Sequence, residues 1–458
     1  MLGAGVCGLA AGMMVGRDGH EVIILERDDA PVPETPEAAW ENWTRDGVIQ
    51  FRQGHYLLPA GRAILEAELP DVTAALAAAG AVQFDSLRMM PPTITDRAPR
   101  PGDERFVTLT ARRPVLEQVF GRAAQAEPRL EVRRGVSVKG LTSRTYNGTP
   151  HVAGVRIDSG EELNADLVVD AMGRRSQLPQ WLKEAGSGAV HEEAEDSGFI
   201  YYTRFFRSLN GGLPELYAPI LSAVGSYSLL TLPSDNETWS VSVYISTGDQ
   251  PLKRLRDPDR WTSLIAACPL HAHWLEGEPI TGVLAMSGVL DRYRRAVVDG
   301  RPAATGVAMF ADAWACTNPS QGRGITFGLW HAQHLRDVVR AHLHEPRAFA
   351  EAWDAVTEAE LTPWYRETLL EDRGRIQEMN ALRNGLEPPQ PDAAVAALLA
   401  AMMHDADLFR AFLESRAGIT TLGETLARPG LVERALELAS DVTPIPGPDR
   451  QQLLQLLE

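Results

Sequence analysis

The sequence predicts an α/β protein with a mainly parallel sheet, a separate antiparallel sheet and a helical C-terminal region. Three observations carry this prediction. A glycine-rich turn, a helix pattern and a buried-strand pattern follow one another in residues 3–26. Residues 198–246 are rich in β-branched and aromatic residues, which favour antiparallel strands. Beyond residue 345 the apolar residues recur at helical spacing.

The glycine-rich turn has the spacing GxGxxG at Gly3, Gly5 and Gly8, and the strand pattern after it ends in Glu26. Such glycines let the backbone approach a pyrophosphate at the start of a helix, and an acid about 20 residues further on binds a ribose 2′-OH. A carboxylate at this place repels a 2′-phosphate. The segment therefore predicts a site for FAD or NAD rather than NADP.

Only Met1 and Leu2 precede the glycine-rich turn, although a first strand of about five or six apolar residues belongs there. This strand would lie in the middle of the sheet, so its loss would leave buried backbone groups of its neighbours unpaired. The sequence predicts either that residue 1 is not the native start or that the FAD site is damaged. The first of these alternatives is favoured.

Residues 302–331 contain a second ligand-binding pattern. A β-type run leads to Asp312, and a loop with Pro319 and Gly322 leads to a helix pattern that begins near Arg323. The carboxylate accepts hydrogen bonds from hydroxyl groups, and the N–H groups and dipole of a helix N-terminus favour negative charge. We expect a sugar or phosphate ligand here; the alternative is an ordinary strand–loop–helix connection.

A third strand pattern, at residues 167–170, ends in a turn that runs from Met172 to Ser176. Together the three segments resemble the FAD-dependent monooxygenases of the aromatic-hydroxylase (para-hydroxybenzoate hydroxylase-like) superfamily, near the bacterial natural-product epoxidases and hydroxylases of secondary metabolism. The resemblance covers roughly residues 1–345, in the right order. It implies a Rossmann-like FAD-binding domain with an antiparallel-sheet substrate domain, ahead of the C-terminal helical region.

The resemblance also implies roles for single residues. The three glycines of the turn bind the pyrophosphate of FAD, Asp312 binds its ribityl–phosphate part, and the loop 319–324 lies near the pyrimidine edge of the flavin. Arg52 and Arg113 contact the cofactor by analogy, with a solvated loop and a surface salt bridge as the respective alternatives. The predicted cofactor-binding residues are Gly3, Gly5, Val6, Cys7, Gly8, Glu26, Arg27, Arg52, Arg113, Asp312, Pro319, Gly322, Arg323, Gly324 and Ile325.

Two residues depart from the family pattern. Met172 stands where an acid is associated with FAD and NAD(P)H handling, and Ala311 stands where a glycine precedes the aspartate. A thioether cannot accept the hydrogen bonds of an acid. Met172 therefore favours reduced flavin arriving with help from a separate flavin reductase over direct reduction by NADH or NADPH. Ala311 is a small steric change that should leave Asp312 in place.

Residues 199–207, 226–232 and 238–246 are expected to form the antiparallel sheet, which in this family walls the substrate pocket. Alternate side chains of a strand share a face, so one face of the first strand is a candidate for substrate contact. Ordinary core packing is the alternative for each aromatic residue. The predicted substrate-binding residues are Tyr201, Thr203, Phe205 and Tyr244.

These patterns divide the chain into parts. The predicted parts are a first FAD-binding part at residues 1–185, a substrate-binding sheet at 186–295, a return to the FAD-binding domain at 296–345 and the helical region at 346–458.

Within the last part, helices are expected at 348–364 and 392–412, with Asp392 as an N-cap, and prolines 444–448 precede a last helical turn. Asn147 and Gly148 predict a hairpin turn between two β-type runs.

The composition fits a large cytoplasmic enzyme. The 458 residues hold 44 basic and 61 acidic residues, a net charge of −17, which disfavours nucleic acid and anionic membranes as partners. Three cysteines without CxxC spacing predict neither a disulfide framework nor a zinc site, and the histidines show no metal-ligand spacing. The longest apolar run, residues 393–403, is too short for a transmembrane segment.

The sequence therefore predicts a flavin monooxygenase that uses O2 to hydroxylate or epoxidise a small hydrophobic aromatic or alkene substrate, through a flavin hydroperoxide as the resemblance implies. Two alternatives stay open. One is an FAD-dependent reductase or dehydrogenase of an isoprenoid- or polyketide-like substrate, and the other is a non-catalytic binding protein with the FAD fold. No side chain is assigned as a catalytic base.

Overall fold

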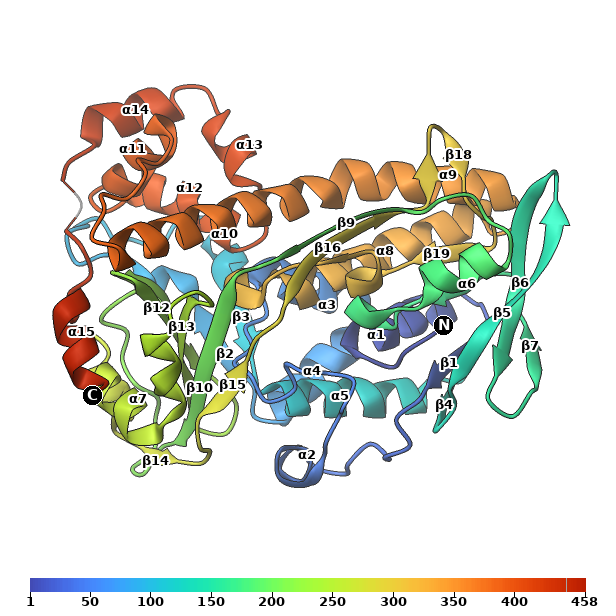
Figure 1. Ribbon diagram of the computed structural model, residues 1–458, viewed down its shortest axis with the longest axis horizontal. Coiled ribbons are helices and arrows are strands. Elements are labelled where there is room, and N and C mark those ends of the chain that lie inside the picture. Colours follow the sequence, from blue (N-terminus) through green and yellow to red (C-terminus); the bar gives the residue numbers. More distant parts are fainter. Residues whose placement is uncertain (442) are drawn as a thin grey trace.

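A parallel sheet lies in one half of the molecule, in the computed structural model that describes residues 1–441 and 443–458 (Figure 1). Its strands are β1 (Val22–Glu26), β4 (Leu130–Arg134), β8 (Val168–Asp170) and β19 (Val307–Met309). β1 pairs with β4 and β8 pairs with β19. Leu2 forms parallel bridges with both Leu25 and Asp170 and so joins the two pairs. The place of the expected first strand is thus held by Leu2, which is buried.

Three helices pack with this sheet in one apolar core. They are α1 (Val6–Arg17), α5 (Arg113–Ala126) and α8 (Arg323–His342). Leu9 of α1, Val119 of α5 and Leu329 of α8 are buried in the same cluster as Ile24 of β1. A Cβ atom on Gly328 would overlap the side chain of Cys7, so Cys7 of α1 packs directly against the backbone of α8 and the two helices approach each other closely.

A three-stranded antiparallel sheet extends from this half, at the right of Figure 1. Its strands are β5 (Val138–Tyr146), β6 (Thr149–Ile157) and β7 (Glu162–Asn164). The predicted hairpin turn is confirmed, because Asn147 and Gly148 separate β5 from β6 with φ angles of 49° and 79°. Positive φ at both central residues is the geometry that favours this pair of residue types in a two-residue turn.

The second half is an antiparallel sheet of order β11-β12-β13-β10-β14, with β15 also paired to β10. Its strands are β10 (Phe199–Arg207), β11 (Leu221–Val224), β12 (Tyr227–Pro233), β13 (Thr238–Ser246), β14 (Glu278–Pro279) and β15 (Leu284–Met286). β10 and β13 have the predicted bounds, and β12 is displaced by one residue. Trp261 of α7 (Pro258–Ala266) packs with Tyr202 and Phe206 on one face, which leaves the face of Tyr201 toward the first half.

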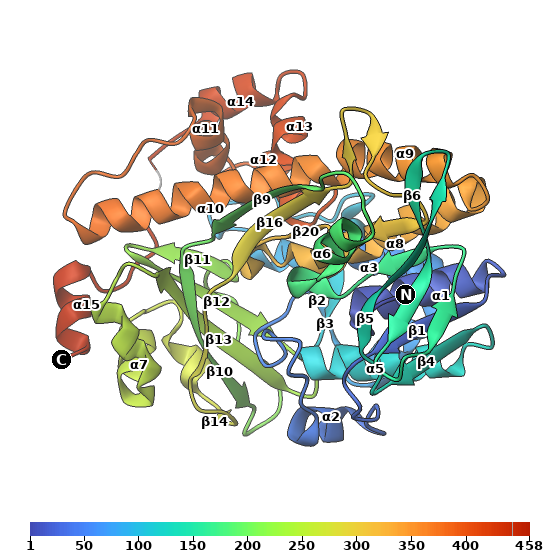
Figure 2. The same ribbon diagram turned by 45° about the vertical axis from the view of Figure 1, so that its right-hand side comes forward.

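Two features connect the halves. β16 (Leu290–Arg295) pairs with β9 (His191–Asp196) and with β20 (Ala315–Cys316) in a long antiparallel ribbon. The helix α10 (Thr362–Arg383) runs over both halves along the upper side of the molecule (Figures 1 and 2). Side chains near the middle of α10 therefore reach the space between the two halves.

The C-terminal region is helical, as predicted, but its helices differ from the expected ones. The elements are α9 (Pro346–Val356), a π-helical turn (Thr357–Leu361), α10, α11 (Ala393–Ala401), α12 (Ala406–Arg416), α13 (Leu422–Leu426), α14 (Leu431–Leu438) and α15 (Arg450–Leu456). Asp392 caps α11, as predicted. The single helix expected at 392–412 is wrong, because Asp405 accepts the N–H groups of Asp407 and Leu408 and starts a second helix there.

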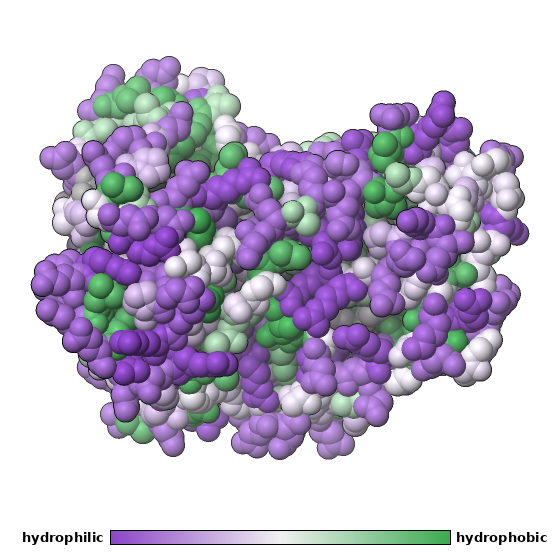
Figure 3. Space-filling view, viewed as in Figure 1, coloured by the Kyte–Doolittle hydropathy of each residue, from purple (hydrophilic) through white to green (hydrophobic). Residues whose placement is uncertain are grey.

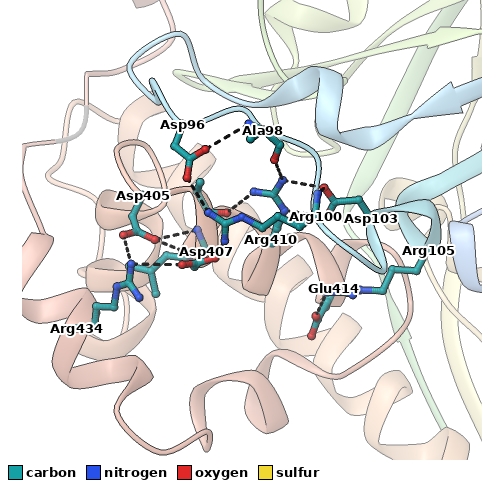
Figure 4. A network of polar contacts seen from close by, with 12 residues as sticks. Asp96, Ala98, Arg100, Asp103, Arg105, Asp405, Asp407, Arg410, Glu414 and Arg434 are labelled. Carbon is teal, nitrogen blue, oxygen red and sulfur yellow. Dashed lines mark hydrogen bonds and ion pairs between the residues drawn. The ribbon is translucent and has the colours of Figure 1, made fainter.

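Ion pairs fasten this helical region to the loop that runs between residues 96 and 105 (Figure 4). Arg410 of α12 forms a bidentate pair with Asp103 at 2.8 Å, Arg105 reaches Glu414 at 2.7 Å, and Arg100 contacts Asp407. Beneath these pairs lies an apolar cluster formed by Met90, Ile94, Phe106, Phe409 and Leu413, among others. The loop and α12 therefore form one packed wall.

The other elements complete the two halves. They are α2 (Pro36–Asn42), α3 (Pro59–Glu68), α4 (Pro70–Ala78), β2 (Val82–Asp85), β3 (Val107–Thr110), α6 (Leu178–Glu184), β17 (Val297–Val298) and β18 (Arg301–Pro302). Hydrophilic side chains cover most of the face in Figure 3, and hydrophobic ones gather over α11 and α14. Within the described residues, every helix is too short or too polar to cross a bilayer.

A buried ion pair holds the two halves together. The side chains of Arg112, at the start of α5, and Asp235, in the β12–β13 turn, are both 0% exposed and lie 2.5 Å apart. Asp235 also accepts the backbone N–H of Arg112 at 2.7 Å. Truncation of Asp235 would leave the buried guanidinium of Arg112 with only Glu37, a 40% exposed carboxylate at 3.0 Å, as an ionic partner. The loss of the buried partner costs much more than the loss of an exposed pair.

We expect Asp235→Ala to lower the free energy of unfolding by about 3–5 kcal/mol. The control is Glu21→Ala, which removes the carboxylate of a pair with Arg129 whose side chains are 77% and 53% exposed; it should cost less than about 1 kcal/mol. Denaturant unfolding monitored by circular dichroism measures both. Equal losses would contradict the structural role of the buried pair.

Candidate functional site

A cavity of about 1150 Å³ opens between the two halves and the C-terminal helices. Its lining includes Gly5 at the start of α1, Tyr201 in β10 and Phe412 in α12. Segments far apart in the sequence therefore share one enclosed space.

Two helix N-termini open into this cavity without side-chain caps. Leu9 donates its N–H to the carbonyl of Gly5, so the N–H groups of Val6, Cys7 and Gly8 precede the first hydrogen bond of α1. α8 likewise begins after Gly322 without a side-chain cap. A Cβ atom on Gly5 or Gly324 would meet nothing within 4 Å, so both helix starts face open space. Such ends attract negatively charged groups.

Glu26 lies at the end of β1, and hydrogen-bond donors of the protein occupy most acceptor positions of its carboxylate. Its carboxylate accepts the N–H groups of Ala4 and Asp28, both at 3.0 Å, and the guanidinium of Arg45 at 2.6 Å. A carboxylate has about four lone-pair sites, so one acceptor position remains for a ligand. The sequence did not indicate Arg45, which reaches Glu26 and Glu117 from an irregular loop.

Arg113 at the start of α5 lines the cavity, while its Nε donates to Glu117 at 2.8 Å. This pair is buried, with side-chain exposures of 9% and 0%, and not the surface salt bridge that was the alternative. Because Glu117 also binds Arg45, the carboxylate fixes both arginines near the end of the cavity that the start of α1 lines.

Asp312 lies on the cavity wall directly after β19. No protein group of the described residues donates a hydrogen bond to its carboxylate. Burial raises the pKa of Asp312, and the positive charges of Arg113 and Arg174 act in the opposite direction. A partly buried carboxyl group without a protein donor can accept hydrogen bonds from a ligand that carries hydroxyl or N–H groups.

Ala311 shows why a glycine is usual before such an aspartate. Its φ angle is 49°, in the left-handed region that disfavours residues with a Cβ atom. His331 accepts the N–H of Ala311 at 3.0 Å and stacks on Trp353 at 4.3 Å. Burial lowers the pKa of His331 well below its usual value, so its neutral ring can accept this hydrogen bond. Ala311 thus keeps the turn at some cost in strain.

The turn after β8 is held by a residue that the sequence did not indicate. Asp170 is fully buried and accepts the N–H of Met172 at 3.0 Å and the hydroxyl of Ser176. Burial raises the pKa of Asp170 to about 6. Asp170 therefore shapes the turn from inside the protein, and Met172 faces the cavity without an acidic group.

Most of the predicted residues meet at the cavity, but the side chains of four do not line it. Arg52 lies over Trp40, with 4.7 Å between its guanidinium and the ring centroid. Arg323 binds Thr368 at 2.7 Å and Glu367 at 2.9 Å, which ties α8 to α10. Of the predicted substrate residues, Tyr201 and Tyr244 line the cavity. Thr203 and Phe205 share the face of Tyr201 but contact Gln53 and Trp40 instead.

The far end of the cavity combines apolar walls with a polar network. Leu230, Met286, Met402 and Phe412 are among its apolar lining residues. The hydroxyl of Tyr201 donates to Asn318 at 2.6 Å, and the amide of Asn318 donates to Asp372 at 3.1 Å. Neither Asn318 nor Asp372 stands in a recognisable motif. Within the described residues, no group of three His, Cys, Asp or Glu side chains is arranged to hold a metal ion.

Comparison with known proteins identifies the fold. No protein-family model matches the chain. "Protein Rv3254" of Mycobacterium tuberculosis is 28% identical in an alignment over 372 residues that covers 74% of this chain and 72% of that protein. PqsL, a probable FAD-dependent monooxygenase from Pseudomonas aeruginosa, superposes with a TM-score of 0.56 and 18% identity over 83% of this chain and 98% of its own. The p-nitrophenol 4-monooxygenase PnpA from Pseudomonas putida DLL-E4 has a TM-score of 0.60 and 16% identity over 93% and 97%.

The chain has the flavin-dependent monooxygenase fold. The family resemblance expected from the three sequence segments is thus confirmed at the level of the fold. Two local features of this chain bear on the site: Ala311 adopts a left-handed conformation, and Met172 presents no acid at the turn after β8.

We expect Ala311→Gly to raise the free energy of unfolding by about 1 kcal/mol, because it removes the left-handed strain of a residue with a Cβ atom. Ala75→Gly is the matched control, since Ala75 is exposed in the middle of α4 and glycine there should cost about 1 kcal/mol. Thermal and denaturant unfolding of both variants show whether each substitution raises or lowers the free energy of unfolding. Destabilisation by both substitutions would show that the turn is not strained.

Proposed function

We propose that this protein is an FAD-dependent monooxygenase that hydroxylates or epoxidises a small hydrophobic aromatic or alkene substrate. One observation carries the proposal: two uncapped helix N-termini and the unpartnered carboxyl group of Asp312 face the same cavity. Such a set suits a ligand that carries phosphates, hydroxyl groups and a ring system that gathers negative charge.

The residues of the cavity fit FAD. The start of α1 would hold the pyrophosphate, the remaining acceptor position of Glu26 the adenosine ribose, and Asp312 the ribityl hydroxyl groups. The parallel pairing through Leu2 and the position of α1 support a Rossmann-like domain for this purpose. Bound FAD, once reduced, would activate O2 and supply the oxygen atom that is transferred.

The task of the protein chain is to bind, orient and exclude water. The N–H groups at the start of α8 favour negative charge on the flavin ring. Leu230, Met286 and Phe412 line the space beyond and suit a substrate that is largely apolar. An apolar wall also keeps bulk water from the reacting atoms.

The electron donor belongs to the proposal as well. Met172 lines the cavity at the turn where an acid is associated with nicotinamide handling. We infer that NADH or NADPH supplies electrons through a separate flavin reductase. Arg174 and Arg175 beside it also line the cavity, and guanidinium groups attract a pyrophosphate such as that of NADH or NADPH. The test must therefore exclude direct reduction of FAD by these nucleotides.

We expect Asp312→Ala to weaken FAD binding roughly ten- to hundredfold, because a charge-assisted hydrogen bond is worth about 1.5–3 kcal/mol. Titration of flavin-free protein with FAD, followed by flavin fluorescence, measures the dissociation constant. The control is Asp337→Ala, which removes a 53% exposed carboxylate of α8 and should leave the affinity unchanged. An Asp312→Ala protein with wild-type affinity and wild-type circular dichroism would refute the assignment.

Purified wild-type protein that is colourless and takes up no added FAD would support the non-catalytic alternative. Equal loss of FAD in both aspartate variants would instead indicate a general effect on the fold.

We expect slow bleaching of bound FAD by NADH or NADPH alone, and fast bleaching when a flavin reductase is added. Anaerobic stopped-flow absorbance, with and without p-nitrophenol as a test substrate, measures the rates. The reason is that Met172 offers no acceptor for the hydrogen bonds of a nicotinamide cofactor. Fast bleaching by either nucleotide alone would refute the need for a reductase without affecting the assignment of FAD.

A further inference from the structure

Asp372 lines the cavity, and one oxygen of its buried carboxyl group has no hydrogen-bond partner among the described residues. It projects from the middle of α10 and is 4% exposed. Its Oδ1 accepts the amide of Asn318 at 3.1 Å and the hydroxyl of Ser320 at 3.0 Å. Its Oδ2 is buried and has no hydrogen-bond partner among the described residues. A buried polar atom without a partner is costly unless a ligand or water completes it.

The groups around Asp372 come from several elements. Tyr201 of β10 and Tyr244 of β13 are buried neutral phenols, since burial raises the pKa of each. Asp291 of β16 accepts the backbone N–H of Asn318 at 2.6 Å. Arg375 and Glu371 share α10 with Asp372, and Glu371 is paired at 2.9 Å with Arg416 of α12.

This surrounding keeps a proton on Asp372. Burial raises the pKa of Asp372 to about 8, the negative charges of Asp291 and Glu371 act in the same direction, and the hydrogen bonds from Asn318 and Ser320 oppose them. Burial raises the pKa of Asp291 only to about 6, so Asp291 is ionised where Asp372 is still neutral. Since both hydrogen bonds to Asp372 enter at Oδ1, the proton belongs on Oδ2, the oxygen without a partner.

We propose that Asp372, in its acid form, donates a hydrogen bond from Oδ2 to an acceptor oxygen of the substrate, such as a carboxylate, phenolate or carbonyl. The proposal rests on the proposed function, because the same cavity holds the substrate. Asn318 and Ser320 are positioning residues, because their hydrogen bonds hold Oδ1 and neither of them occupies Oδ2. The substrate class is then an apolar ring or chain that carries one acceptor oxygen at the end facing α10.

The test measures binding of 4-nitrobenzoate to the full chain by isothermal calorimetry, between about pH 7 and about pH 9.5, with saturating FAD. The probe is ionised throughout, and so is Asp291 for the most part. We expect wild-type affinity to fall roughly tenfold or more as Asp372 loses its proton, because a donor is then replaced by a negative charge. 4-Nitrotoluene, which has the same ring without the acceptor, should bind weakly at each pH.

Two variants of Asp372 separate the effect of its hydrogen-bond donor from the effect of its titrating proton. Asp372→Asn keeps an N–H donor that does not titrate, so its affinity for 4-nitrobenzoate should stay level over the same pH range. Asp372→Leu removes the donor and should bind the probe weakly throughout. Asp337→Asn, on the exposed side of α8, is the control and should show the wild-type pH profile. Thermal unfolding of each variant confirms that the chain is folded.

A wild-type protein that binds 4-nitrobenzoate independently of pH, or not at all, would overturn the proposal. An Asp372→Asn protein with the wild-type fall in affinity would do the same, even if Asp372→Leu fails to fold. The titration is repeated on flavin-free protein. Failure to bind FAD would count against the proposed function, whereas the pH profile of probe binding still tests Asp372.

Discussion

The close approach of backbone segments at three glycines is the constraint on which the site depends. A Cβ atom on Gly3 would lie 2.6 Å from the carbonyl oxygen of Ala171, and one on Gly8 would overlap the carbonyl of Gly3. One on Gly328 would overlap the side chain of Cys7. Because Gly3, Gly8 and Gly328 carry no side chains, the starts of α1 and α8 and the turn after β8 lie close together. Two helix N-termini thereby open into one cavity, which neither could form alone.

The residues of this junction could be predicted because their signals are local. Glycine spacing, an acid at a strand end and enrichment in β-branched and aromatic residues are properties of short segments, and β10 and β13 have the bounds that this enrichment predicted. The turn at Asn147 and Gly148 follows from the positive φ angles that this pair tolerates. The order of such segments along the chain was sufficient to predict the fold.

The rest depends on contacts between distant parts of the chain. Asp372 lies in a polar helix, and only the packing of distant segments around it, among them the loop of Asn318, 54 residues away, gives it the burial that raises its pKa. Arg45 stands in an irregular loop and meets Glu117 across 72 residues. Thr203 and Phe205 share a face with Tyr201, but they contact Gln53 and Trp40 and not the cavity. The alternation of side chains shows which face of the sheet a residue lies on, but not which part of that face borders the cavity. The helix break at Asp405 was missed because capping aspartates also occur on exposed helix surfaces.

The polar groups at the two ends of the proposed site differ in charge, and the charges at one end bear on the other. At the cofactor end, the free N–H groups of α1 and α8 favour negative charge, and Glu26 and Glu117 are offset by Arg45 and Arg113. At the other end, Glu371 is paired with Arg416, and burial keeps Asp372 neutral beside the ionised Asp291. A further ionised carboxylate there would oppose both a reduced flavin and an anionic substrate. A neutral acid instead donates a hydrogen bond, so the same protonation state that relieves repulsion among the carboxylates also provides a means of recognising an acceptor oxygen.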